Sequence, residues 1–498
     1  MAILCVPLTG RTADEMLAVM RALPPFVQAV EARMDYMAGD IVRLAAQLEA
    51  LCRGKDRTLI VTVRPKREGG LWDGPEPQRL DLLRRACALG AEYIDVELDS
   101  VAALGGTSGS TRRIVSHHNF QQTPADLEAL HRQAAAAGAD VVKITVTARD
   151  IADTLPVFAL LKRHAARVPT IALSMGEEGL PTRVLASKFG GFLTYASLEA
   201  GKGSAPGQVP WHDMEQMYRF HRIGPATPVY GVVANPVAHS MSPAIQNAAF
   251  AELDMDAVYL PFKVAEPKAF LDGYQPLDLR GLSVTIPHKE AMLALMDETD
   301  ELSRRVGAVN TVDIRGGRRY GSNTDVAAAL AALTGAAERA GLLPLARRTV
   351  LLVGAGGAGR ALAYGLAGQA GRLFIANRTA SRAERLAADV GADTCGLDEI
   401  GTLRPDVLIN TTSVGMHPKV DDTPVPAAAL RKGMVVFDAV YNPIETRLLR
   451  EAREAGCVTA SGFDWFVSQA AAQFETWTGR RAPRDIMADV VRRRLSRA

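Results

Sequence analysis

The chain has 498 residues, and 57 Lys and Arg against 55 Asp and Glu give it a formal net charge of +2. This length exceeds one ordinary hydrophobic core, so we expect two or three domains. A near-neutral chain without a long basic or acidic block gives no electrostatic case for binding nucleic acid or an anionic membrane surface, so small-molecule substrates are expected instead.

The five cysteines are scattered, with no CxxC pair and no His at metal-ligand spacing. They predict reduced thiols, a cytoplasmic protein and no metal site. No apolar run approaches the roughly 20 residues that span a bilayer. Met1 leads directly into the strand-like segment AILCVPL, so no cleavable leader is expected.

Short β-rich apolar runs alternate with helix-length segments through the first part of the chain. They predict strands at 3–8, 28–33, 58–63, 93–97, 113–117, 141–145, 170–173 and 192–196. Strands separated by helices form the βα units of a parallel sheet, and this number of units in about 200 residues fits a closed (β/α)8 TIM barrel. An open doubly wound sheet is the alternative.

Lys143 interrupts the apolar strand 141–145, where an ammonium group is costly to desolvate unless it is paired or deprotonated. An interior lysine of this kind suggests a nucleophile that forms a Schiff base. The alternative is an amine that reaches water from a strand end. The preceding strand places His117 and His118 at the same end of the barrel.

Cationic and polar side chains recur at the same strand ends: Arg33, Arg64, Arg183, Ser204 and Gln208. Barrel active sites form at the C-terminal face of the sheet, so together these groups could bind a carboxylate and several hydroxyls. Taken singly, each arginine is also explained as a surface ion-pair partner.

Five segments in order resemble type I 3-dehydroquinate dehydratase over residues 1 to 222: Glu31-Ala-Arg33, Arg64 with Glu68-Gly-Gly, Ser116-His-His118-Asn-Phe, Val-Lys143-Ile and Ser204-Ala-Pro-Gly-Gln208. The resemblance implies that Lys143 condenses with the substrate ketone and that His118 shuttles protons as water leaves. It also implies a substrate-binding set of Glu31, Arg33, Arg64, Arg183, Ser204 and Gln208.

Gly and two prolines interrupt the pattern at 222–228, so we expect a barrel at 1–223, a linker at 224–228 and a second enzyme at 229–498. Strands are predicted at 229–233, 257–264, 281–285, 308–314 and 318–322, before a helix at 326–340. Further strands at 349–353, 373–376, 407–409 and 435–437 alternate with helices, which is typical of a doubly wound nucleotide-binding fold. The expected parts are a substrate-binding lobe (229–340), a Rossmann lobe (345–465) and C-terminal helices (466–498).

A glycine loop follows the strand at 349–353: Gly354, Ala355, Gly356, Gly357, Ala358 and Gly359. Between a strand and a helix, this G-x-G-x-x-G pattern predicts a pyrophosphate site at the helix N-terminus, the alternative being a glycine-rich turn without a ligand. The next strand ends in Asn377, Arg378 and Thr379, with Arg382 one turn later, where an NAD site carries an acid. Guanidinium groups there pair with a 2′-phosphate, which favours NADP(H) unless both arginines are merely solvated.

A hydride transferred to a ketone leaves an alkoxide that needs a proton, so a lysine near a carboxylate is the expected apparatus. Lys289, at a predicted helix start after the strand 281–285, is the candidate, and Asp325 supplies the carboxylate. Alone, each is also explained as an ordinary charge near a helix N-terminus.

Segments at 235–243, 283–289, 307–311, 323–325 and 462–469 look like shikimate dehydrogenase and together span residues 229 to 498. The resemblance implies that Lys289 and Asp325 are the catalytic pair. It assigns shikimate binding to Ser240, Ser242, Thr285, Asn310, Asp325, Tyr441 and Gln469, and it places Gly462 in the cofactor-binding set.

The combined hypothesis is an α/β chain in which a TIM barrel precedes a two-lobed shikimate dehydrogenase unit with a Rossmann NADP-binding domain. Such a chain dehydrates 3-dehydroquinate to 3-dehydroshikimate and reduces this to shikimate with NADPH, in the shikimate pathway of aromatic amino acid biosynthesis. One alternative is a quinate/shikimate dehydrogenase that uses NAD and has a weak or inactive barrel. Another is a ligand-sensing regulator, which would lack Lys143, Lys289 or Asp325 or carry a DNA-binding appendage.

Overall fold

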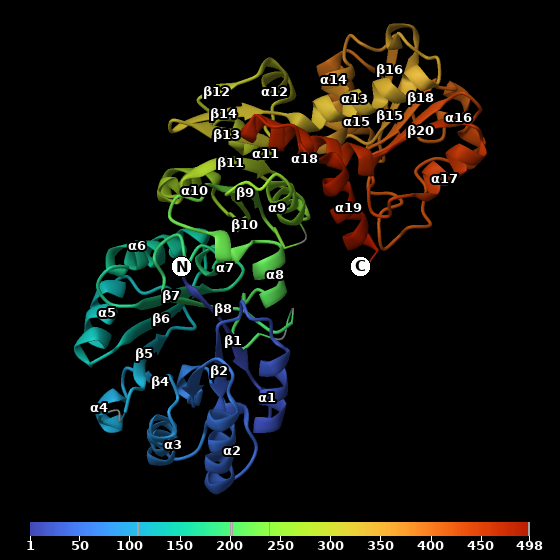
Figure 1. Cartoon of the computed structure of the whole chain (residues 1–498). Helices are drawn as coiled ribbons and strands as arrows, with labels where there is room; N and C mark the ends of the chain where they lie inside the picture. Colours follow the sequence, from blue (N-terminus) through green and yellow to red (C-terminus); the bar gives the residue numbers. More distant parts are fainter. Residues whose placement is uncertain (107–108, 200, 202, 239, 497–498) are drawn as a thin grey trace. The chain divides into compact units, whose positions relative to one another are not determined.

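The computed structural model describes residues 1–106, 109–199, 201, 203–238 and 240–496 (Figure 1). It divides into two compact units, one of Met1–Ser240 with Asp256–Leu279 and the other of Met241–Met255 with Arg280–Ala498. His239, which falls in the 235–243 segment, lies outside the described residues. The domain boundaries expected from the sequence stay predictions.

The first unit contains a nearly closed parallel barrel, in the order β7-β6-β5-β4-β3-β2-β1-β8. Its strands, in the part of the chain that is described, are β1 (Ile3–Leu8), β2 (Ala29–Arg33), β3 (Thr58–Thr62), β4 (Tyr93–Glu97), β5 (Arg112–His118), β6 (Val141–Thr147), β7 (Thr170–Met175) and β8 (Leu193–Tyr195). At the seam, the Phe192 amide donates to the Thr170 carbonyl at 2.8 Å. The barrel prediction is therefore confirmed.

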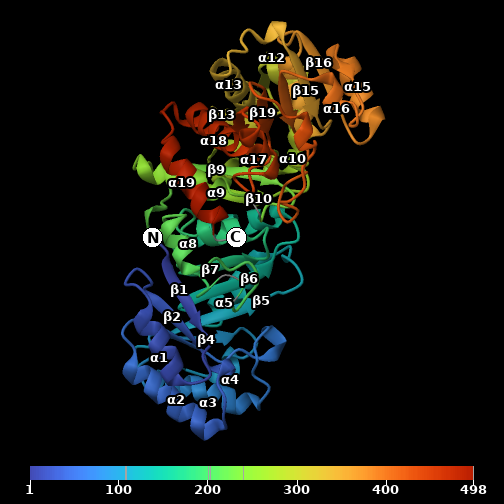
Figure 2. The ribbon, with the colours of Figure 1, turned by 90° about the vertical axis from the view of Figure 1, so that its right-hand side faces the viewer.

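Helices cover the outside of the barrel strands, as Figures 1 and 2 show for α1, α2 and α3. The barrel helices are α1 (Ala13–Ala22), α2 (Ile41–Gly54), α3 (Glu76–Ala88), α4 (Val101–Leu104), α5 (Leu127–Ala136), α6 (Leu155–His164), α7 (Leu180–Val184) and α8 (Trp211–Gln216). Polar caps start several of them: the Asp40 and Asp126 side chains accept from the amides of Arg43 and Ala129. Apolar side chains such as Cys5, Ile60 and Ile114 close the interior.

The structure differs from the sequence prediction mainly at strand ends. Strand β5 runs on to His118 and β6 to Thr147, whereas β8 is only Leu193–Tyr195. The first unit also includes the parallel pair β9 (Val229–Ala234) and β10 (Val258–Lys263), followed by α10 (Pro267–Gly273). None of the helices in the described part of the chain is long and apolar enough to cross a membrane.

The second unit contains an antiparallel set of strands. It comprises β11 (Leu279–Val284), β13 (Thr311–Arg315) and β14 (Arg318–Ser322), with β12 (Glu298–Thr299) paired parallel to β14. The helices of this part are α9 (Ser242–Glu252), α11 (Lys289–Leu293), α12 (Glu301–Val306) and α13 (Thr324–Arg339). The turn from β11 into α11 presents Lys289 at the first position of that helix.

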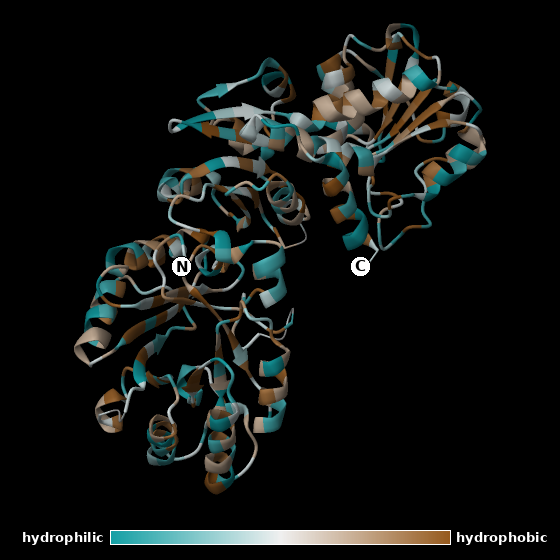
Figure 3. Cartoon of the chain, in the orientation of Figure 1, coloured by the Kyte–Doolittle hydropathy of each residue, from teal (hydrophilic) through white to brown (hydrophobic). Residues whose placement is uncertain are grey.

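A parallel Rossmann sheet follows, in the order β17-β16-β15-β18-β19-β20. Its strands are β15 (Thr349–Val353), β16 (Arg372–Ala376), β17 (Asp393–Thr394), β18 (Val407–Asn410), β19 (Val435–Asp438) and β20 (Val458–Ser461). Its helices are α14 (Gly357–Leu366), α15 (Ala380–Val390), α16 (Ile400–Leu403), α17 (Arg447–Glu454), α18 (Gly462–Thr478) and α19 (Arg484–Leu495). The central strands β15, β18 and β19 are mostly hydrophobic and buried, as expected of a sheet covered on both faces (Figure 3).

Candidate active sites

Lys143 lies in one layer of the barrel interior with three polar side chains. Glu31, Asp95, Lys143 and Tyr195 come from β2, β4, β6 and β8, the alternate strands that contribute one layer of a (β/α)8 barrel. Lys143 Nζ lies 2.7 Å from Asp95 Oδ2, 2.9 Å from the Tyr195 hydroxyl and 3.4 Å from Glu31 Oε1. All four side chains are buried, so the lysine is not an amine that reaches bulk water.

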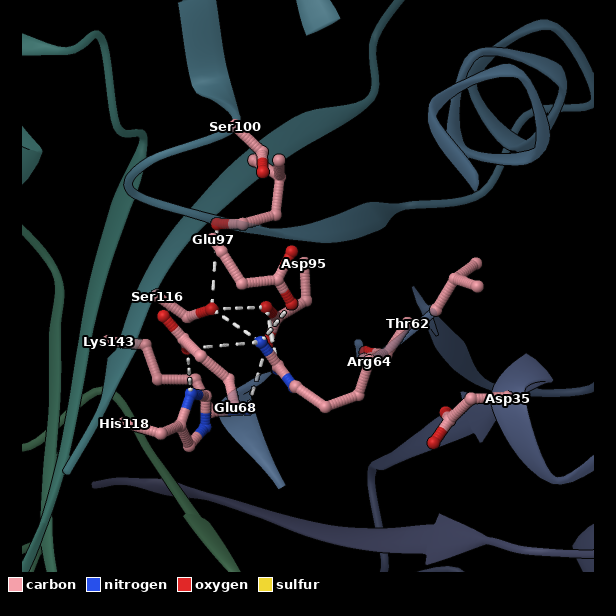
Figure 4. A network of polar contacts seen from close by, with 12 residues as sticks. Asp35, Thr62, Arg64, Glu68, Asp95, Glu97, Ser100, Ser116, His118 and Lys143 are labelled. Carbon is pink, nitrogen blue, oxygen red and sulfur yellow. Dashed lines mark hydrogen bonds and ion pairs between the residues drawn. The ribbon is translucent and has the colours of Figure 1, made fainter. Parts of the chain in front are cut away.

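Arg64 lies beside this layer at the centre of a buried polar network (Figure 4). Its guanidinium contacts Asp95 Oδ1 at 2.8 Å, Glu97 Oε1 at 2.5 Å and Ser116 Oγ at 2.8 Å. Asp95 therefore bridges two cations, Arg64 and Lys143. Burial alone would raise the pKa of Asp95, but Arg64 and Lys143 hold that pKa well below its ordinary value.

His118 and Glu68 form a hydrogen-bonded pair on the pocket wall, with His118 Nδ1 2.8 Å from Glu68 Oε2. Burial, with the nearby cations Arg64 and Lys143, lowers the pKa of His118 well below 6.5. Burial also raises the pKa of Glu68 to about 8. Near neutral pH the imidazole is thus uncharged and the carboxyl group holds a proton, so the pair can pass a proton in either direction.

Of the two adjacent imidazoles, His118 lines the pocket. Successive strand side chains point to opposite faces, so His117 points away from the pocket that His118 lines. Burial lowers the pKa of His117 too. The structure therefore favours His118 as the proton-transfer group.

Arg33 and Arg183 give the pocket two further cations. Arg33 is held by two hydrogen bonds to Asp35, at 2.9 and 2.7 Å. Arg183 donates to the Pro206 carbonyl at 3.2 Å, and among the described residues its Nε has no hydrogen-bond partner. Burial lowers the pKa of Arg183 to about 10. A buried guanidinium with an unpaired N–H fits a carboxylate ligand.

The pocket brings together every barrel residue that the sequence predicted. Its lining includes Glu31, Arg33, Arg64, His118, Lys143, Arg183, Ser204 and Gln208. The Gln208 side-chain oxygen accepts from the Ser204 amide at 2.9 Å, so these two residues are held next to each other. The sequence prediction gave no role to Glu68 or Tyr195, which also line the pocket, or to Asp95 beside it.

A second pair of titratable groups lies in the other unit, where Lys289 Nζ is 2.6 Å from Asp325 Oδ2. The side chains are 34% and 17% exposed, so both remain open to a ligand. Asn323 caps helix α13 by accepting from the Val326 amide, and Trp465 Nε1 donates to the Asp325 carbonyl at 2.8 Å. The start of α13 is thereby held, and the carboxylate faces the lysine.

The residues expected to bind shikimate differ in how they are held. Asn310 is buried, and its Oδ1 accepts from the Thr324 amide at 2.8 Å next to Asp325. Gln469 donates to the Phe466 carbonyl at 3.1 Å, and the Tyr441 ring stacks on Phe466 with centroids 4.6 Å apart. Thr285 is half-buried in the turn before α11. Ser242 begins α9 in the second unit, whereas Ser240 belongs to the first.

The glycine loop has the shape that a pyrophosphate requires. Gly354 has a φ of +111°, and a Cβ there would lie 2.6 Å from Thr411 Oγ1. A Cβ on Gly359 would lie 2.1 Å from the Gly354 carbonyl oxygen, so this glycine allows α14 to pack closely. Gly356 and Gly357 have open space beside them at the start of α14, where a phosphate can meet the helix amides. The residues present fit a dinucleotide.

The expected 2′-phosphate site lies at the end of β16. Asn377 Oδ1 accepts from the Ala355 amide at 3.1 Å, and its Nδ2 donates to the Thr379 carbonyl at 2.9 Å. Asn377 thus joins the glycine loop to the β16 turn. Arg378 and Arg382 are exposed beside it. Gly462 lies against the Ala439 backbone, where a Cβ would lie 2.4 Å from the carbonyl oxygen.

Four family patterns match consecutive parts of the chain. Residues 4–225 match type I 3-dehydroquinase, and 232–312 match the shikimate dehydrogenase substrate binding domain. Residues 336–446 match shikimate / quinate 5-dehydrogenase, and 462–492 match the shikimate 5′-dehydrogenase C-terminal domain.

Individual proteins are similar to the whole chain or to its second part. A chloroplastic bifunctional 3-dehydroquinate dehydratase/shikimate dehydrogenase of Arabidopsis thaliana is 42% identical, over 97% of this chain and 83% of that protein. A shikimate dehydrogenase (NADP(+)) of Natronomonas pharaonis is 46% identical, over 54% of this chain and 99% of that protein. A crystal structure of a shikimate dehydrogenase in complex with NADP+ has a TM-score of 0.50 and 36% identity, over 55% of this chain and 97% of that one.

Proposed function

Since the chain belongs to the family of bifunctional 3-dehydroquinate dehydratase/shikimate dehydrogenases, we propose that the two pockets described above carry the two reactions of that family. The chain is a lyase and an NADP-dependent oxidoreductase of the shikimate pathway. The assignment of individual residues to each step is the proposal. The cytoplasmic location stays a prediction.

The observation that carries the dehydratase assignment is the burial of Lys143 among Glu31, Asp95 and Tyr195. In the proposed reaction Lys143 attacks the ketone of 3-dehydroquinate and forms an imine, which acidifies the neighbouring C–H bond. His118 removes that proton and returns a proton to the departing hydroxyl group as water leaves. Glu68 sets which nitrogen of His118 carries the proton, because it contacts Nδ1.

Substrate placement follows from the charges of the barrel pocket. Arg183, buried with an unpaired Nε among the described residues, is assigned to the substrate carboxylate. Arg33, Arg64, Ser204 and Gln208 are assigned to the hydroxyl groups and the ketone. Glu31 lines the same pocket, and its carboxylate can accept from a substrate hydroxyl.

For the second reaction we propose that Lys289 protonates the developing alkoxide of 3-dehydroshikimate. Asp325, at 2.6 Å, holds the ammonium group in place and accepts from a substrate hydroxyl. Within the second unit, Ser242, Thr285, Asn310, Tyr441 and Gln469 complete the proposed shikimate site. The role of Ser240, which belongs to the first unit, stays a prediction from the sequence. NADPH supplies the hydride when bound, and its proposed contacts are the loop 354–359, Asn377, Arg378, Thr379, Arg382 and Gly462.

One coupled assay tests both assignments. Purified chain receives 3-dehydroquinate and NADPH, and the product is identified by mass and chromatography. Shikimate is the expected product, and Lys143→Ala stops the first step without affecting reduction of added 3-dehydroshikimate. Borohydride added with 3-dehydroquinate leaves a reduced adduct on the Lys143 peptide. Full dehydratase turnover by Lys143→Ala would refute the covalent assignment.

A further inference from the structure

The hydrogen-bonding capacity of the Lys143 ammonium group is matched by its surroundings. An ammonium carries three N–H donors, and Nζ has three oxygen partners: Asp95 at 2.7 Å, the Tyr195 hydroxyl at 2.9 Å and Glu31 at 3.4 Å. Asp95 and Glu31 are carboxylates, which only accept when ionised. Tyr195 is the one partner of the three that can also donate.

Imine formation by this ammonium group has a fixed proton balance. The C–N bond forms as the carbonyl π bond breaks, and the C–O bond then breaks as the nitrogen lone pair makes C=N. Nζ begins with three protons and ends, as an iminium, with one. The two protons it loses are the two that the ketone oxygen gains as it leaves as water, so no external acid is needed. Both protons must therefore travel from Nζ to that oxygen.

We propose that Tyr195 relays one of these protons, accepting it from Lys143 Nζ while donating its own hydroxyl proton to the substrate ketone oxygen. The second proton passes through the Glu31 carboxylate, and Asp95 stays as the counter-ion of the iminium. The relay rests on the imine mechanism proposed above and adds a residue to it.

The surroundings of Tyr195 favour a proton relay in which the phenol is neutral both before and after the transfer. Its side chain is only 4% exposed and lines the pocket that contains Lys143. Burial, with the carboxylate of Glu31, raises the pKa of Tyr195 well above its ordinary value, so the phenol stays neutral. A hydroxyl that accepts and donates together builds no charge in this buried site, where a separated charge is costly. An ionised carboxylate must first gain a proton before it can give one.

Tyr195→Phe tests the relay because it removes the hydroxyl and keeps the ring. Enzyme and 3-dehydroquinate are mixed for a single turnover, quenched with borohydride at set times, and analysed for the mass added to the Lys143 peptide. We expect imine formation to slow by about 10²-fold, the lower end of the range for proton-transfer groups. Reduction of 3-dehydroshikimate by the same chain should be unchanged, which reports the concentration of intact dehydrogenase. A far-UV denaturation profile like that of the wild type reports that the barrel is folded.

Tyr93→Phe is the matched control. Tyr93 belongs to the same core cluster as Tyr195, but its hydroxyl lies 3.3 Å from Arg112 Nη1 and takes no part in the site. This variant should form the imine at the wild-type rate. If Tyr195→Phe also keeps the wild-type rate, within about twofold, the relay is wrong.

A second measurement needs no variant. Imine formation by the wild-type chain is timed in H2O and in D2O, and a relay predicts a normal solvent isotope effect on this step. The absence of an isotope effect would overturn the relay even if Tyr195→Phe did not fold. Neither result bears on the imine itself, which stands or falls with Lys143→Ala and the borohydride adduct.

Discussion

One carboxylate, Asp95, neutralises two buried cations: its Oδ2 lies 2.7 Å from Lys143 Nζ, and its Oδ1 lies 2.8 Å from Arg64 Nη2. The Asp95 side chain is fully buried. Removing its charge therefore leaves two buried cations, a guanidinium and an ammonium group, with less compensation in a low-dielectric interior. The same carboxylate therefore contributes to the stability of the barrel and holds the Lys143 amine in place.

Asp95→Asn should destabilise the barrel by about 3–5 kcal/mol, because breaking a buried ion pair leaves uncompensated charge. The measurement is chemical denaturation, with unfolding monitored by the far-UV signal. The control is Asp81→Asn, which breaks an exposed pair with Arg85 on α3. It should cost about 0.5 kcal/mol or less. Equal effects of the two substitutions would show that Asp95 carries no special electrostatic role.

The Glu68–His118 pair predicts a pH dependence for the dehydratase. In the proposed mechanism, His118 acts as a base through Nε2 only when Nδ1 keeps its proton, and a Glu68 carboxylate accepts from that N–H. Since burial raises the pKa of Glu68 to about 8, kcat/KM should rise as pH increases through that value. The low pKa of His118 keeps the imidazole neutral through this range.

Glu68→Gln separates this explanation from others, because the amide oxygen can still accept from His118 Nδ1 but does not titrate. The rise near pH 8 should disappear, and the remaining profile should be flat there. A variant profile that still rises would assign the transition to another group. Glu399→Gln, an exposed substitution far along the chain in the Rossmann lobe, should leave the wild-type profile in place.

The folding stability of the barrel should also depend on pH through Glu68. The pKa of Glu68 in the folded chain is above that of the unfolded chain, whose reference value is 4.5. The stability contributed by the protonated group is therefore fully present below pH 4.5 and is lost as pH rises through about 8. The melting temperatures of wild type and Glu68→Gln should be measured across this range. They should be most alike at low pH and differ more as pH rises, because the melting temperature of the variant should fall less at high pH.

The sequence predicted both folds because each rests on local periodicity. Strands such as 141–145 and 349–353 are apolar runs between helix-length segments, and a glycine loop after a strand marks a nucleotide site. Lys143 could be found because it is a charge inside an apolar strand. Asp95 carries the same signal in Tyr93-Ile-Asp-Val-Glu97, and Glu68 follows a strand end as Arg64 does.

Tyr195 gave no such signal, since a tyrosine in a short strand is ordinary core. Its contact with Lys143 depends on the register of the closed barrel, which places residues of the even strands in one layer. Predicted strand ends were also imprecise: β5 continues one residue beyond its predicted end and finishes at His118. Barrel closure brings together strands that are far apart in the chain, so local sequence patterns do not predict the contacts between them.

Lys289→Ala should lower kcat for shikimate formation by about 10²-fold or more and change the affinity for NADPH little, because the lysine is assigned to proton transfer. Steady-state rates and NADPH fluorescence titration measure the two quantities. Lys268→Ala is the control, since Lys268 makes a pair of the same length with Asp272 on the exposed face of α10. An unchanged kcat for Lys289→Ala would return Lys289 to the role of a helix-start charge.

The double substitution Arg378→Ala with Arg382→Ala should raise the KM for NADPH by about 10- to 100-fold, because charge-assisted hydrogen bonds to the 2′-phosphate are lost. NADH has no phosphate at that position, so its KM should barely change, and the preference between the two cofactors should narrow accordingly. Arg385→Ala is the matched control: Arg385 is also exposed on α15, but its Nε donates to the Ser381 carbonyl of its own helix. If the KM values for both cofactors rose together, the arginines would be supporting the fold of the β16 turn, and the selectivity for NADP would have to come from other residues.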